Sequence, residues 1–136
     1  MVLYRSSVLL VIVLCGCSTG STAGSEAEAR KHLDAEFRKW MGGHESQVET
    51  LESSLENRMD PISYDVRSVV PDKPDLLAAI GENNPGGSDD YSLWPAWRFN
   101  VAIEWKSRAG TPIEKVTTYR LTWNPRSKAW HVVERF

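Results

Sequence analysis

Three histidines are the residues of this sequence best suited to metal binding or to proton transfer near neutral pH: His32, His44 and His131. A zinc or iron site needs several His, Cys or carboxylate side chains at short, regular spacing. None of the three has such a partner at metal-ligand spacing on its own predicted element, and His32 lies beside Leu33 in a helical pattern. A structural or solvated role is therefore the better prediction for each, and the sequence predicts no metal and no cofactor.

Nucleophilic catalysis and calcium binding are also poorly supported. The sequence contains neither a Gly-x-Ser-x-Gly elbow nor a Ser-x-x-Lys pair. Within the stretch 82–92, rich in turn-forming residues, oxygen ligands are offered by Glu82, Asn83, Asn84, Asp89 and Asp90. These residues lack the one-three-five spacing and the closing glutamate of a calcium loop. We therefore expect a solvated loop or a partly disordered insert there.

The segment Trp94-Pro95-Ala96-Trp97 is a candidate binding feature, because it places two aromatic residues beside a proline just before a predicted strand. Trp94 and Trp97 could form a stacking surface for sugar rings or for a partner's apolar side chain. They could equally close the open end of the sheet, and this second interpretation is preferred.

Charged residues alternate along the C-terminal strands and form a second candidate binding surface. If no bulge shifts the register, six of them point to one face of the sheet: Arg98, Glu104, Lys106, Arg120, His131 and Arg135. Alternating charges most often mark a solvated face with weak cross-strand pairs. The alternative is that a partner or a second copy of the chain docks here, with Arg98, Arg120 and Arg135 as the binding residues.

The first sixteen residues are predicted to be a targeting segment rather than part of the fold. Arg5 precedes an apolar run from Val8 to Leu14, which is about seven residues long against the roughly twenty needed to cross a bilayer. Leu14-Cys15-Gly16-Cys17 follows directly. This tetrapeptide resembles the lipobox of bacterial lipoproteins, although Cys15 is unusual at its position. The resemblance implies cleavage before Cys17 and a diacylglycerol thioether on its thiol. The alternative is an ordinary secretory signal cut after a small residue.

A lipid on Cys17 would anchor the protein in the cell envelope. Ser18 is compatible with the periplasmic face of the outer membrane in a Gram-negative cell. Both cysteines lie in the signal and its cleavage site, so the mature domain has no disulfide and no thiol chemistry. The chain has 16 Lys and Arg against 18 Asp and Glu. It contains no basic stripe, which excludes a nucleic-acid partner.

The folded domain is predicted to span residues 25–136, after a lipidated and flexible tether at 17–24. Ser25-x-x-Glu28 has the form of a capping box, and Gly42-Gly43 ends the helix that it begins. The apolar face of this helix consists of Leu33, Phe37, Trp40 and Met41. A second helix is predicted from Ser46 to Asp60, with Val48, Leu51, Leu55 and Met59 on one face.

Alternation of apolar and polar residues predicts a strand over 62–70, bounded by Pro71 and Pro74, and a short helical turn over 76–80. Three more strands are predicted at 98–106, 116–123 and 129–136. Short turns between them indicate an antiparallel meander. One face of this sheet is apolar and must be covered by the first helix; Trp40, Trp105 and Trp123 are in phase with the core.

This α+β order, a helix packed on a roughly four-stranded antiparallel sheet, resembles the cystatin-like and NTF2-like folds. The resemblance rests on element order over 25–136 and on Trp40-Met41-Gly42-Gly43. The inhibitory Gln-x-Val-x-Gly loop of cystatins is absent, because Gln47-Val48 lacks its spacing. An NTF2-like enzyme would bury an acid or a tyrosine in a pocket between helix and sheet. Tyr64, Asp65 and His131 are the candidates for this group.

The favoured interpretation is a non-catalytic envelope lipoprotein that binds or scaffolds another component. Its partners would be the membrane, through the lipid, and an envelope protein or a second copy of the chain. The alternatives are an NTF2-like pocket protein that binds or converts a small molecule, and carbohydrate binding through Trp94 and Trp97.

Overall fold

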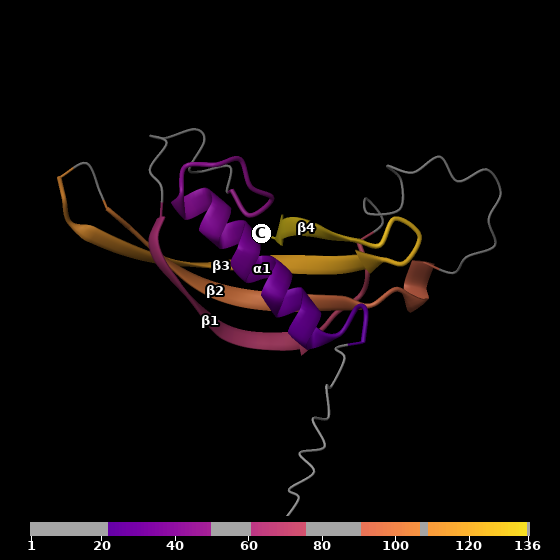
Figure 1. The fold of residues 1–136 in the computed structure, drawn as a ribbon. Helices are drawn as coiled ribbons and strands as arrows, with labels where there is room; N and C mark the ends of the chain where they lie inside the picture. Colours follow the sequence, from indigo (N-terminus) through magenta and orange to yellow (C-terminus); the bar gives the residue numbers. More distant parts are fainter. Residues whose placement is uncertain (1–21, 50–60, 76–90, 107–108, 136) are drawn as a thin grey trace, which may run out of the picture.

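The computed structural model describes residues 22–49, 61–75, 91–106 and 109–135. In these ranges one helix crosses one face of a four-stranded antiparallel sheet, whose strands follow the order β1-β2-β3-β4 (Figure 1). The elements are α1 (Glu26–Met41), β1 (Pro61–Pro71), the short 3-10 helix η1 (Tyr91–Leu93), β2 (Ala96–Lys106), β3 (Pro112–Asn124) and β4 (Ala129–Arg135). The α+β class, the helix-on-sheet layering and the C-terminal meander are confirmed.

Helix α1 begins and ends where the capping residues predict. The hydroxyl of Ser25 accepts a hydrogen bond from the backbone N–H of Glu28 at 3.2 Å, which satisfies one of the free amides at the helix start. At the other end, the N–H of Gly42 donates to Arg38 O at 3.1 Å. Gly43 then has φ +76°, a conformation that glycine adopts without strain and that ends the helix.

The core lies between α1 and the sheet, and it combines aromatic with aliphatic side chains. Phe37 stacks on Tyr64 with ring centroids 4.3 Å apart and meets Tyr119 edge-on at 5.7 Å. Trp40 is 2% exposed and contacts the ring of Trp105 edge-on. Trp105 and Trp123 are half-buried and pack against this core, as predicted.

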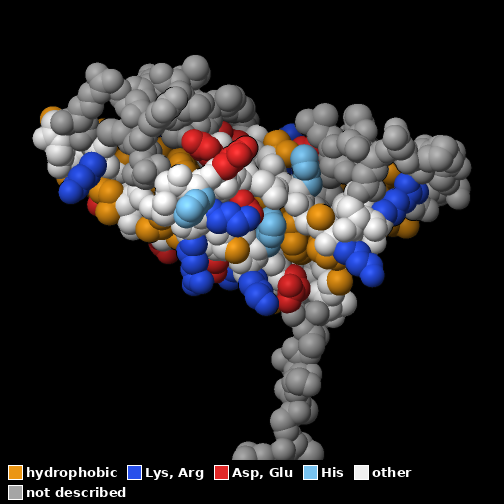
Figure 2. Space-filling view, turned by 45° about the horizontal axis from the view of Figure 1, so that its top comes forward, with side chains coloured by type: hydrophobic (Ala, Val, Ile, Leu, Met, Phe, Trp, Pro, Cys, Tyr) orange, Lys and Arg blue, Asp and Glu red, His pale blue; other side chains and the backbone are white. Residues whose placement is uncertain are grey.

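Met41 was predicted to share the apolar face of α1, and this is wrong. Its side chain is 38% exposed, because it lies at the last position of the helix, beyond the part that the sheet covers. On the face of the molecule seen in Figure 2, side chains of Lys and Arg are interspersed with those of Asp and Glu.

Strand β1 does not alternate as predicted. Its pairing with β2 shifts between Pro61 and Ser63 and again between Val66 and Ser68. An extra residue in one strand reverses the direction of the side chains that follow it. Val69 therefore packs against the core, while Ile62 is 40% and Val70 37% exposed.

The predicted second helix is not present over its first residues. Residues 44–49 form a turn and extended segment, in which Ser46 O accepts from the N–H of Glu49 at 3.4 Å. The rest of this predicted helix, at 50–60, lies outside the described residues, as do the predicted helical turn at 76–80 and the carboxylates of the predicted loop at 82–90. Residues 91 and 92, at the end of that predicted loop, belong to η1.

Gly24 was predicted to belong to the flexible tether, but it is buried. Its carbonyl accepts a hydrogen bond from Trp97 Nε1 at 3.0 Å, and its α-carbon lies against Pro95 and Trp123. The ordered domain therefore begins no later than Gly24. Among the described residues, no helix has the length and apolar character needed to cross a bilayer.

Candidate functional site

The face of the sheet turned away from α1 carries the charged residues that the alternation predicts. Pairing is unbroken from β2 to β3 and from β3 to β4, so a single register sets the directions of all side chains on these strands. Arg98 lies opposite Arg120, and Arg135 lies opposite Thr118, which in turn faces Asn100. The prediction that the six charged residues share one face is confirmed. We call this surface the open face.

One end of the open face is hollowed into a depression of about 390 Å³, which we call the arginine basin. Its lining residues come from β1, β2, β3 and β4 and from the segment after β1: Val70, Asp72, Arg98, Asn100, Thr118, Arg120 and Arg135. The sheet thus brings together the predicted binding residues Arg98, Arg120 and Arg135.

Asp72 and Arg120 form a partly buried ion pair at the wall of the basin. Arg120 Nε lies 2.9 Å from Asp72 Oδ2, and the two side chains are only 14% and 12% exposed. Burial by itself would raise the pKa of Asp72. Hydrogen bonds from Arg120 and from the N–H of Lys73, with the charges of Arg120 and Arg98, instead hold this pKa below its ordinary value of 3.8. Asp72 is therefore ionised at neutral pH, and it neutralises Arg120.

The floor of the basin is a short chain of hydrogen bonds. Thr118 Oγ1 donates to Asn100 Oδ1 at 2.8 Å, and Asn100 Nδ2 donates to Ser68 Oγ at 2.8 Å. These bonds fix the orientation of the Asn100 amide.

Arg98 and Arg135 are exposed, and neither forms a hydrogen bond or an ion pair with another residue in the described ranges. Arg98 also faces Arg120 directly across the β2–β3 pair, and like charges at such positions repel each other. The basin therefore concentrates positive charge that the described part of the protein does not neutralise.

The two candidate tryptophans lie outside the basin. Trp94 is 7% exposed and contacts the ring of Tyr91 edge-on at 5.3 Å. Trp97 is half-buried against the core side of β2, with its N–H bonded to Gly24. The two rings therefore do not form one exposed stacking surface. This arrangement agrees with the interpretation that they close the end of the sheet.

The three candidate acid–base groups are not brought together. Tyr64 faces the helix and donates to Asp34 Oδ1 at 2.9 Å; burial, then this bond, raises its pKa to about 12. Asp65 lies on the open face, with its side chain 69% exposed and paired with Arg67 at 3.3 Å. His131 faces the same side from β4, opposite Thr122. Beside Tyr64, the space between helix and sheet is filled by Phe37.

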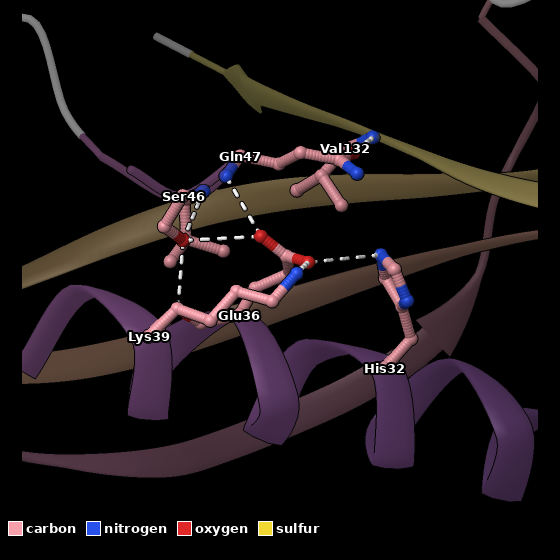
Figure 3. Close-up of polar contacts among 7 residues, drawn as sticks. His32, Glu36, Lys39, Ser46, Gln47 and Val132 are labelled. Atoms are coloured by element: carbon pink, nitrogen blue, oxygen red, sulfur yellow. Dashed lines mark hydrogen bonds and ion pairs between the residues drawn. The ribbon is translucent and has the colours of Figure 1, made fainter. Parts of the chain in front are cut away.

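A second polar cluster, which the sequence analysis missed, surrounds Glu36 on α1 (Figure 3). The Glu36 side chain is 3% exposed and accepts hydrogen bonds from Lys39 Nζ at 2.6 Å, Gln47 N at 2.9 Å and Ser46 Oγ at 3.2 Å. Burial alone would raise the pKa of Glu36. The bonds from Lys39, Gln47 and Ser46 instead hold it below its ordinary value of 4.5.

The prediction that no histidine has a carboxylate at ligand spacing is wrong for His32. Its Nε2 lies 3.9 Å from Glu36 Oε1, one turn further along α1, and has no hydrogen-bond partner among the described residues. Burial lowers the pKa of His32, although the charge of Glu36 opposes this effect. No group of three or more potential ligands for a metal ion occurs within the described ranges. His44, also a candidate, is exposed after the end of α1.

The role of the Glu36 cluster is to hold the segment after α1 against the fold. Ser46 Oγ also donates to the Glu36 carbonyl at 2.7 Å, and Gln47 Oε1 accepts from the N–H of Val132 at 3.2 Å. Gln47 thereby occupies a backbone donor on the outer edge of β4. The burial of Glu36 could have been predicted from the sequence. Its position follows the helical core spacing of Ala29, Leu33 and Trp40, and all four residues are buried.

Asp72, Asn100 and Thr118 are the basin residues that the sequence analysis did not single out. Asn100 and Thr118 lie on predicted strands, on the same face as the arginines, and could have been included. Asp72 follows β1, and only the β1–β2 pairing brings it to Arg120. Cys17 lies outside the described residues.

Comparisons of the chain with protein-family models, with curated protein sequences and with solved structures give no match.

Proposed function

We propose that this protein is a membrane-anchored lipoprotein whose folded domain is a non-catalytic binding module, and that the open face binds its partner in the cell envelope. The observation that carries the proposal is the pair Arg98 and Arg135. Both line a basin, and neither forms a hydrogen bond or an ion pair with another described residue. An anionic group supplied by another molecule could therefore pair with these two guanidinium groups.

The chemistry of the basin favours binding over catalysis. Its guanidinium groups stay protonated at all physiological pH values and do not exchange protons with a substrate. Asp72 is ionised and engaged by Arg120, so it is a poor general acid. Such a site can hold and orient an anion, which suits a binding or scaffolding module.

The anchor part of the proposal rests on the lipobox resemblance at Leu14-Cys15-Gly16-Cys17. The described domain adds a geometric consequence. Because a fully extended chain advances about 3.5 Å per residue, Gly24 can lie no more than about 25 Å along the chain from Cys17. A lipid on Cys17 would therefore keep the basin within a few nanometres of the bilayer.

Site-specific photocrosslinking in native membranes tests the binding face. A photoreactive residue would replace Val116 or Val133 on the open face in the full-length chain, with Lys31 on α1 as the control position. We expect adducts from the open face that disappear in the double variant Arg98→Gln/Arg135→Gln. Adducts formed equally well from position 31, or adducts that survive the double variant, would contradict the proposal.

A further inference from the structure

We infer that the arginine basin binds a phosphate monoester, held as a dianion between Arg98 and Arg135. This inference rests on the proposed function, since it assigns a ligand class to the same open face.

Charge is the first consideration. Asp72 and Arg120 form an ion pair at 2.9 Å and neutralise each other. Arg120 therefore forms part of the wall of the basin, and its guanidinium is already paired. With three arginines and one aspartate, the lining of the basin carries a net charge of +2. A phosphate monoester carries between about −1.5 and −2 at neutral pH, which matches this charge, whereas a single carboxylate supplies only half of it.

The spacing of the two arginines favours one small tetrahedral group. Arg98 and Arg135 lie on β2 and β4, two strand spacings apart and one row offset, with Thr118 and Arg120 on β3 between them. Their backbones are thus separated by about 10 Å across the sheet and about 7 Å along it. Two arginine side chains leaning over β3 would approach a group between them from opposite sides. Each guanidinium fork can donate two hydrogen bonds to phosphate oxygens.

The basin lies at the end of the sheet where the chain enters the domain. Gly24 packs against Pro95 and Trp123. Arg98 on β2 follows Pro95 by three positions, and Arg120 on β3 precedes Trp123 by three positions. With Cys17 within about 25 Å of Gly24, a phosphate at the surface of the anchoring membrane is within reach. A lipid headgroup is therefore the favoured source, and a soluble phosphate ester is the other.

The test measures thermal unfolding of the full-length lipoprotein, because a ligand that binds only the native state raises the melting temperature. One arm adds glycerol 3-phosphate or succinate to protein in phosphatidylcholine vesicles. The other arm compares vesicles with and without phosphatidic acid. We expect stabilisation by a phosphate monoester in at least one arm, and the arm that responds identifies the source. Succinate should bind about tenfold more weakly, because it lacks the tetrahedral group that the two forks share.

Two double variants distinguish binding at the arginine basin from a general attraction of anions to positive charge on the protein. Arg98→Gln/Arg135→Gln should weaken binding by about a hundredfold, since each charge-assisted contact contributes roughly tenfold or more. Arg30→Gln/Lys31→Gln removes the same charge from α1, on the other face of the sheet, and should keep the effect. Because neither Arg98 nor Arg135 has a hydrogen bond among the described residues, the basin variant should unfold at the same temperature as the wild type without ligand.

Lowering the pH supplies an independent signature. A phosphate monoester loses its second charge near pH 6, so its affinity should fall as the pH decreases through that value. Asp72 stays ionised there, so the charge that it contributes to the basin does not change.

Absence of stabilisation in both arms, equal binding of succinate, an affinity unchanged through pH 6, or full binding by Arg98→Gln/Arg135→Gln would overturn the phosphate assignment. Each of these results is separate from the crosslinking experiment. Adducts from the open face that depend on the two arginines would keep the proposed function standing with a different anionic partner.

Discussion

Gly24, which has no side chain, packs at the point where the start of the domain meets the end of the sheet. Its φ of +83° falls in the left-handed region. A Cβ placed there would lie 2.7 Å from Pro95 Cγ and 3.2 Å from Trp123 Cδ1. Both the backbone conformation and the close contact therefore require glycine, and the Trp97 side chain completes the contact through its bond to the Gly24 carbonyl.

Gly24→Ala should destabilise the protein more than Gly110→Ala does. Gly110 has a similar φ of +81°, but nothing lies within 4 Å of a Cβ added there. The left-handed conformation alone should cost about 1–2 kcal/mol in both variants. Contact with Pro95 and Trp123 should add about 1–3 kcal/mol in Gly24→Ala only. Urea unfolding of the two variants measures the difference in the free energy of unfolding. Equal losses in the two variants would show that the chain at position 24 can move away from Pro95 and Trp123 without loss of stability.

At the scale of elements, the segment after α1 protects an edge of the sheet. An edge strand exposes backbone donors and acceptors that another strand can pair with, which favours aggregation. The Gln47 side chain accepts from the Val132 N–H at 3.2 Å, and the buried carboxylate of Glu36 holds Gln47 in place through its backbone. A charged group on the helix thus determines how β4 is covered.

The contribution of Glu36 should depend on pH with a defined sign. Its pKa in the folded protein lies below the ordinary value of 4.5, so its stabilisation is complete above that value and is lost as the pH falls through the folded pKa. Glu36→Gln should lower the free energy of unfolding by about 1–3 kcal/mol at neutral pH. The difference from the wild type should shrink progressively below pH 4.5.

Asp72 titrates in the same acidic range, but it is present in both proteins and cancels in this comparison. Glu26→Gln is the matched control, because its side chain is 50% exposed and its pair with Arg30 is a surface contact. We expect a change below about 0.5 kcal/mol for this control. A difference between wild type and Glu36→Gln that stays constant from pH 7 to pH 3 would rule out the stabilising carboxylate.

At the scale of the whole molecule, the position of the domain relative to a membrane depends on residues before the described fold. The net charge of −2 gives no general attraction to anionic lipids, and the membrane attachment proposed above rests on the lipid on Cys17. The buried Gly24 limits the free length of the connection, and the basin lies at the same end of the sheet. In the proposed scheme, a lipid on Cys17 would lie no more than about 25 Å along the chain from Gly24.

Cys17→Ala should abolish incorporation of a labelled fatty acid and release the protein from the membrane fraction. Cys15→Ala is the matched control and should keep the label, because only the residue at the cleavage site carries the lipid in the proposed scheme. Metabolic labelling followed by fractionation checks both variants. Label that persists in Cys17→Ala would place the lipid on another residue and contradict the proposal, whereas a wild type without label would indicate an ordinary secretory signal.

The sequence by itself determined the features that depend on neighbours along the chain. The two ends of α1 follow from Ser25 and from Gly42-Gly43, which act within one turn. The open face follows from strict alternation on β2, β3 and β4, so Arg98, Arg120 and Arg135 could be grouped correctly before their surroundings were known. Local geometry is sufficient for both, because caps and alternation involve residues a few positions apart.

Only the tertiary structure decided the features that depend on pairing between distant segments. The register shifts in β1 turn Val69 inward, where uninterrupted alternation predicts Val70. Asp72 reaches Arg120 because β1 pairs with β2, and Glu36 is buried because residues 46 and 47 supply its donors. These contacts join residues far apart in the sequence, and register and burial arise only when the sheet and helix assemble. The sequence could therefore name the arginines, but only the assembled sheet could show which of them form no ion pair with another described residue.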